Sequence, residues 1–111
     1  MAYLKERYPH ALIRKVEVWN PFAHKRQDLW GYDVLVAQPY FGFVFVQVTD
    51  DEHRAEHRTA LQNDQRSAHL LTCGAKLVLH SWGKHGARGR RKLWSLHEEE
   101  ITTAGNEAVA R

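Results

Sequence analysis

The stretch that most constrains the fold is residues 43–49, Phe-Val-Phe-Val-Gln-Val-Thr, in which β-branched and aromatic residues are nearly continuous. A strand with one face in solvent alternates apolar and polar residues, so an unbroken run is typical of a central strand that is buried on both faces. Residues 32–38, Tyr-Asp-Val-Leu-Val-Ala-Gln, form a second strand-like run, and the Pro-Tyr-Phe-Gly sequence at 39–42 is a turn signal. The two runs predict a pair of strands joined by a tight turn.

The rest of the chain supplies helices and further strands. Acidic residues 50–52 indicate the start of a long helix, because carboxylates stabilise a helix N-terminus, and Gly74 is the expected left-handed stop after a helix that ends near Cys73. The other expected elements are a short helix over 2–8, strands over 12–19, 76–82 and 93–98, a polar loop over 22–28 and a frayed tail over 102–111.

This element order predicts an α/β fold, α-β-β-β-α-β-β, with a mixed sheet flanked by helices. Three consecutive strands are expected to form an antiparallel meander, and the strand after the long helix can lie parallel to its neighbour in the same sheet. The chain has 111 residues with no linker and no internal repeat, so we expect a single domain over 1–111 with its core at 12–98.

Cysteine usage and hydropathy predict a compartment. The single cysteine, Cys73, excludes an internal disulfide and indicates a reducing environment, and we expect it to be buried as a small apolar residue. Residues 1–10 lack the apolar core of a signal peptide, and no apolar run approaches the roughly 18 residues that cross a bilayer. These features predict a cytoplasmic protein with no membrane partner.

Positive charge is concentrated in one short stretch. The formal net charge is +3 at pH 7, and residues 83–92, Gly-Lys-His-Gly-Ala-Arg-Gly-Arg-Arg-Lys, are strongly basic. Such a cluster is typical of nucleic-acid binding through phosphate contacts, although a solvated loop has the same composition. The cations expected to contact nucleic acid are Lys84, Arg88, Arg90, Arg91 and Lys92, together with Arg54 and Arg58 on the long helix.

Two short motifs on the predicted strands resemble the PD-(D/E)XK nuclease superfamily. The Gly-Tyr-Asp motif at 31–33 opens the second strand, where that family has its aspartate, and the Gln-Val-Thr motif at 47–49 stands on the third strand in place of the family's D/E-x-K triplet. The spacing between the motifs fits two strands joined by a tight hairpin. The chain resembles small archaeal and phage-type Holliday-junction-resolvase-like proteins most, and this likeness includes Trp-Asn at 19–20, Asp-Leu-Trp-Gly at 28–31 and His-Ser-Trp-Gly-Lys at 80–84.

The resemblance implies a metal-dependent, structure-selective endonuclease that hydrolyses phosphodiester bonds in branched or junction DNA. It also implies a homodimer, since two symmetric strands must be cut. The implied cofactor is Mg²⁺ (or Mn²⁺), a hard cation that prefers oxygen ligands and lowers the pKa of an attacking water. The metal ligands would be Asp33, Gln47 and the Val48 carbonyl, and the catalytic residues would be Asp33, Gln47, Thr49 and Glu17, with Asp28 as a weaker candidate carboxylate.

Two positions depart from the family pattern. Gln47 is neutral where a carboxylate is usual, and Thr49 replaces the lysine, whose positive charge a hydroxyl cannot supply. Lys76, Lys84 and Arg58 are alternatives for that role, and the sequence leaves the choice open. The same departures fit a second interpretation, a non-catalytic nucleic-acid-binding protein on a degenerate nuclease fold, in which Gln47 and Thr49 are polar residues at a strand end.

Histidines on the long helix allow a more distant alternative. His53 and His57 fit the pattern H-x-x-E-H and share one helix face, so they could bind zinc. The favoured interpretation instead places both histidines, with Arg54 and Arg58, on a polar helix surface that faces phosphate. Four tryptophans could stack on bases, but core or interface positions are expected for them: Trp19, Trp30, Trp82 and Trp94.

Overall fold

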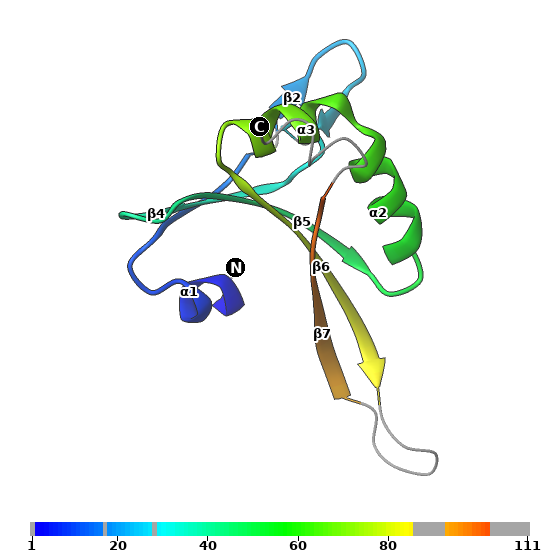
Figure 1. The fold of residues 1–111 in the computed structure, drawn as a ribbon. Coiled ribbons are helices and arrows are strands. Elements are labelled where there is room, and N and C mark those ends of the chain that lie inside the picture. Colours follow the sequence, from blue (N-terminus) through cyan, green and yellow to red (C-terminus); the bar gives the residue numbers. More distant parts are fainter. Residues whose placement is uncertain (1, 17, 28, 86–92, 103–111) are drawn as a thin grey trace.

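A five-stranded mixed sheet organises the protein (Figure 1). The computed structural model describes residues 2–16, 18–27, 29–85 and 93–102. The strand order in the sheet is β1-β4-β5-β6-β7, so the chain belongs to the α/β class, as predicted. These strands are β1 (Leu12–Lys15), β4 (Val34–Gln38), β5 (Gly42–Asp50), β6 (Lys76–His85) and β7 (Leu93–Glu100).

The strand directions confirm the expected meander and crossover. β1 pairs with β4, and β4 with β5, in antiparallel fashion, whereas β5 and β6 are parallel and are connected through the helical segment. β7 returns antiparallel to β6 at the sheet edge. β5 is the central strand, as predicted. Residues 44–47 are buried on both faces, whereas Phe43 and Val48 of the same run are exposed, so the expected burial is confirmed for the middle of the run.

Helices cover the two faces of the sheet and divide the core in two. On one face, α1 (Ala2–Arg7) packs with Val36, Val46 and Val78 through Leu4. On the other face, α2 (Arg54–Asn63) and α3 (Gln65–Thr72) contribute Leu61 and Leu70, which pack with Phe45, Leu77 and Leu79 among others. Alternate residues of each strand therefore belong to an α1 face and an α2 face.

The long helix expected after residue 50 is two helices, so that prediction was wrong in its continuity. Asp64 between them is extended (ψ 122°), and its carboxylate accepts a hydrogen bond from the Arg66 N–H at 2.9 Å. An aspartate that caps a new helix in this way competes with continuation of the previous helix. Gly74 does end α3, with φ 88°, while the Ala75 N–H bonds to the Leu70 carbonyl in a Schellman-type arrangement.

Other local expectations were wrong. The first strand ends at Lys15, and the expected polar loop contains a strand of a separate antiparallel hairpin, β2 (Val18–Asn20) with β3 (Lys25–Gln27). Cys73 is exposed at the C-cap of α3, because the cap residue lies beyond the buried face of the helix. Three tryptophans are exposed in the chain and do not lie in its core, which leaves an interface as the prediction for them: Trp19, Trp30 and Trp94.

None of the helices in the described part of the chain is long and apolar enough to cross a membrane. The expected tail, except for Thr102, lies outside the described residues.

Candidate functional site

The ends of β4 and β5 bring the two motifs together. The last β4–β5 pair is Val34 with Val46, and Asp33 and Gln47 are the residues next to this pair on the two chain segments. The Asp33 N–H donates to the Val46 carbonyl at 3.1 Å, and the Asp33 carbonyl accepts from the Val16 N–H at 2.9 Å. Asp33 and Gln47 therefore lie at the same end of the β4–β5 hairpin.

A tight turn delivers Asp33 to this position. The Tyr32 N–H donates to the Leu29 carbonyl, and Trp30 and Gly31 between them have φ values of 54° and 90°, as in a type I′ turn. A Cβ on Gly31 would lie 3.1 Å from Leu61 Cδ2, so glycine suits both the backbone and the packing. Tyr32 is fully buried, and its hydroxyl hydrogen-bonds to Ser67 Oγ of α3 at 2.9 Å. The residue that precedes Asp33 is therefore anchored to the core.

β5 continues past the end of β4 and remains paired with β6 as far as Asp50 with Trp82. Gln47 and Thr49 alternate with Val48 along this extension, so they share the α2 face with Phe45, whereas Val48 faces the other side. Gln47 is 6% exposed and Thr49 is half-buried. Gln47 is therefore buried in the sheet, whereas a polar residue at a strand end is usually exposed to solvent.

The β6 and β7 residues on this face extend the site across the sheet. Register places Leu79 beside Gln47 and Glu99 beside Leu79, while Ser81 and His97 form the adjacent row with Thr49. Glu99 is thus a carboxylate on the same face, two strands from Gln47. Our sequence interpretation missed Glu99, although alternation along residues 93–100 could have placed it with His97 on one face.

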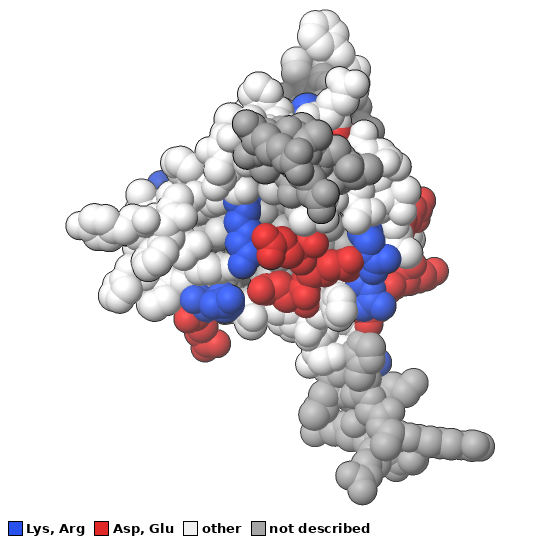
Figure 2. Space-filling model, viewed as in Figure 1, with Lys and Arg blue, Asp and Glu red and all other residues white. Residues whose placement is uncertain are grey.

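α2 supplies a cation to the same face. Arg58 Nε donates a short hydrogen bond to Glu99 Oε1, and its Nη2 donates to Oε2 at 3.0 Å. This hydrogen-bonded contact with Glu99 raises the pKa of Arg58 above its ordinary value. Figure 2 shows acidic side chains gathered over the region of β7 with basic side chains on both sides of them.

The ion pairs bear on the predicted phosphate contacts. Arg58 is engaged with Glu99, and Arg54 Nη1 lies 3.6 Å from Asp51 Oδ1. Phosphate contacts by these two arginines, which remain a prediction, would compete with these carboxylates. Of the three candidates for the missing lysine, Arg58 lies on the α2 face, whereas Lys76 begins β6 at the far end from Thr49 and Lys84 lies beyond the β5–β6 pairs.

The proposed metal ligands have the oxygen atoms that a hard metal ion prefers, but they carry little negative charge. Asp33, Gln47 and the Val48 carbonyl offer oxygen atoms, which Mg²⁺ prefers, yet Asp33 is the one carboxylate among those three. Oδ1 of Asp33 is shielded from solvent, so this oxygen faces the protein interior. Within the described ranges, no three His, Cys, Asp or Glu side chains are grouped closely enough to bind a metal ion.

One of the two histidines in the H-x-x-E-H pattern has a local partner. His53 Nδ1 lies 2.7 Å from Asp50 Oδ1, and this contact raises the pKa of His53. The pKa of the Asp50 carboxyl is lowered, first by the hydrogen bond from the His53 N–H and then by the ring. Zinc binding at His53 and His57 remains the distant alternative.

The basic stretch begins on a two-stranded arm. β6 and β7 pair as far as His85 with Leu93, and Lys84 Nζ lies 5.3 Å from the ring centroid of the exposed Trp94. This geometry indicates a cation–π contact at the arm. Six of the predicted residues lie outside the described ones: Glu17, Asp28, Arg88, Arg90, Arg91 and Lys92.

Comparison of the chain with protein-family models, with curated proteins and with solved structures finds no match. A function for this chain therefore has to be proposed from the residues and geometry of the site itself.

Proposed function

We propose that this chain is a metal-dependent, structure-selective DNA endonuclease related to the PD-(D/E)XK nucleases, with branched DNA as its substrate. One observation carries the proposal: Asp33 and Gln47 flank the last pair of the β4–β5 hairpin, Val34 with Val46, on a sheet in which β5 leads through helices to a parallel β6. This is the order in which the resemblance requires the aspartate and the triplet. Two symmetric strands of a junction would be cut by a homodimer.

The proposed roles follow from position. Asp33, Gln47 and the Val48 carbonyl would hold Mg²⁺ or Mn²⁺, which supplies a polarised phosphate and a more acidic bound water. Thr49, two residues beyond Gln47 on the same face, can donate or accept a hydrogen bond and so orient a water molecule. Arg58 is the cation best placed to substitute for the family's lysine, and Glu99 holds its guanidinium over this face.

The arm supports binding of DNA. Lys84 and Trp94 offer a cation and an aromatic ring beside each other, and the sequence that follows Lys84 is rich in arginine. Phosphate contacts of this kind give an affinity that falls steeply with salt, because condensed counterions are released on binding. A β-ribbon with such residues is suited to follow a nucleic-acid backbone.

A second function, DNA binding without cleavage, is favoured by one observation. Gln47 and Thr49 stand where the family has a carboxylate and a lysine, and the described residues hold no three-membered group of metal-ligand side chains. A site with one carboxylate binds a divalent cation more weakly than a site with two, since a charge is lost. The two functions differ in the cleavage step alone.

The deciding experiment compares wild type with Asp33→Asn. Nicking of a four-way junction is measured with Mg²⁺ and with Mn²⁺, in parallel with binding, and Glu56→Gln on the exposed side of α2 is the matched control. We expect cleavage to be lost in Asp33→Asn and retained in Glu56→Gln. DNA binding should persist in both variants. In Asp33→Asn the substitution removes a carboxylate that repels phosphate, so it does not weaken binding.

Equal cleavage by wild type and Asp33→Asn would show that the site is misplaced. Binding without cleavage by pure wild type, with either metal, would establish the non-catalytic alternative.

A further inference from the structure

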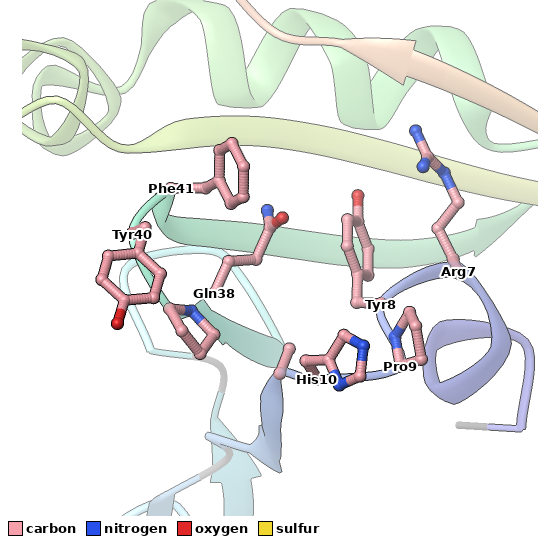
Figure 3. Close-up of a pocket in the computed structure, with 9 residues that line it drawn as sticks. Arg7, Tyr8, Pro9, His10, Gln38, Tyr40 and Phe41 are labelled. Carbon is pink, nitrogen blue, oxygen red and sulfur yellow. The ribbon is translucent and has the colours of Figure 1, made fainter.

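A cavity on the α1 side of the sheet has no part in the site described above. It has a volume of about 340 Å³ and lies between the α1–β1 connection and the tip of the β4–β5 hairpin (Figure 3). This volume is at the lower end of the range of small-molecule sites, which is about 300–1,000 Å³. Figure 3 shows Tyr40 and Phe41 on the hairpin side of the cavity, and Tyr8 and His10 on the α1 side.

The hairpin tip carries aromatic rings that do not serve the core. Tyr40 and Phe41 are almost fully exposed to solvent. Tyr40 also has a φ of 68°, a left-handed conformation that is unfavourable for a residue with a Cβ. Strain and apolar exposure at one turn are unfavourable for the free chain, so a role in binding accounts for them better than a role in folding.

Polar groups of the cavity complement the edge of a base and a phosphate. Gln38 ends β4 beside the tip, and its amide offers both a donor and an acceptor. In Figure 3 the Gln38 amide and the Tyr8 hydroxyl point the same way. Arg7 lies at the rim with its Cζ 5.1 Å from the Tyr8 ring centroid.

A cation at the rim of the cavity suits an anionic ligand. With histidine counted as neutral, Arg7 is the one charged side chain among the described residues that line the cavity. Arg7 Nη2 is 3.9 Å from Glu98 Oε1, at the limit of an ion pair, and its side chain remains about half exposed. A phosphate at the rim therefore meets the Arg7 guanidinium in competition with the Glu98 carboxylate.

We propose that this cavity binds one unstacked nucleobase of the DNA, and this inference rests on the proposed DNA-binding function. Phe41 stacks on the base, the Gln38 amide hydrogen-bonds to its edge, and Arg7 contacts the adjoining phosphate. Bases next to a branch point or in a single strand are the ones that can leave the stack at low cost. The cavity would thus recognise the unpaired nucleotides that distinguish branched DNA from duplex.

The test uses 2-aminopurine, a base whose fluorescence reports stacking, placed at an unpaired position of a branched DNA. We expect its emission to change when wild type binds, and not when Phe41→Ala binds. Affinity for this DNA should fall about 5- to 150-fold in Phe41→Ala, the range for loss of one stacking ring. Phe22→Ala is the matched control, because Phe22 is 96% exposed at another hairpin, outside the cavity.

A second variant guards against a change in the hairpin itself. Gln38→Met keeps the length of the side chain but removes the amide. It should weaken binding of branched DNA that has a base at the unpaired position. It should not weaken binding of the same DNA with an abasic linker at the unpaired position. Unchanged fluorescence on binding, or equal losses with the abasic DNA, overturns the inference. Loss of a protein dimer in Phe41→Ala, with base binding intact, also overturns it and assigns the tip to self-association.

The outcomes separate this inference from the nuclease. Cleavage that depends on Asp33, without a fluorescence change, removes the base site alone. A fluorescence change without cleavage removes the nuclease alone, and failure to bind any DNA removes both.

Discussion

The hydrogen bond between Tyr32 and Ser67 should behave as a coupled pair in a double-mutant cycle. The Tyr32 hydroxyl lies 2.9 Å from Ser67 Oγ, and both residues are 0% exposed. Tyr32→Phe leaves the serine hydroxyl buried without this partner, and Ser67→Ala does the same to the tyrosine. An unsatisfied buried polar group costs about 1–3 kcal/mol, so each single substitution should lower the free energy of unfolding by that amount.

The double variant is the informative member of the cycle. When both polar partners are replaced by apolar groups of nearly the same shape, the change in stability is small, since no polar group is left buried alone. We therefore expect the stability loss of Tyr32→Phe/Ser67→Ala to be smaller than the sum of the two single losses. The difference, which is the interaction free energy of the pair, should be about 1–3 kcal/mol. In a domain of this size, each 1 kcal/mol corresponds to about 4–8 °C in Tm.

Urea denaturation of the four proteins, followed by circular dichroism, measures all the required free energies under one condition. Substitutions at independent sites are additive to within about 0.5 kcal/mol. An interaction free energy smaller than this would therefore refute the buried hydrogen bond. It would also remove the proposed anchor of the turn that delivers Asp33 to β4.

Two further predictions concern pH and the turn. His80 is 2% exposed, and burial lowers its pKa below 6.5, so protonation favours the unfolded chain. The free energy of unfolding should therefore be highest above pH 6.5 and fall as the pH drops. The fall should be larger in wild type than in His80→Gln, and His97→Gln is the exposed control. Equal acid sensitivity of wild type and His80→Gln would contradict this. Gly31→Ala should lower the free energy of unfolding, measured in urea, more than Gly42→Ala does. Both glycines have φ near +90° (90° and 92°), so the backbone strain is the same. Of the two positions, only at Gly31 does an added Cβ meet a side chain, 3.1 Å away. Equal losses would show that this contact relaxes freely.

Much of the sheet could be predicted from the sequence because its signals are local. The apolar run at 43–49 specifies a buried strand whatever its neighbours are, and Gly74 specifies a left-handed stop. The antiparallel meander and the parallel crossover follow from the element order. Asp64 shows the limit of such reasoning, because one helix was expected from residues 50–52 to Cys73, whereas the Asp64 carboxylate caps a second helix within that range.

The site was predicted in part. Strand spacing predicted that Asp33 and Gln47 lie at the same end of the β4–β5 hairpin, since hairpin register is a local property. The pairing of Arg58 with Glu99 was not predicted, because the two residues are 41 positions apart and meet only when α2 covers β6 and β7. The exposure of Trp94 was also missed, since apolar character alone does not tell which residues the helices cover.

By itself, the sequence determined what depends on neighbouring residues: the strand periodicities, the helix end at Gly74, the hairpin that joins the two motifs and the basic stretch that starts at Lys84. The tertiary structure alone decided which cations are ion-paired, which face of the sheet carries Glu99, and that a cavity lies between Tyr8 and the hairpin tip. The physical reason is that side-chain pairing and burial depend on elements that are distant in the chain, and their positions are set by packing of the whole sheet rather than by local backbone preference.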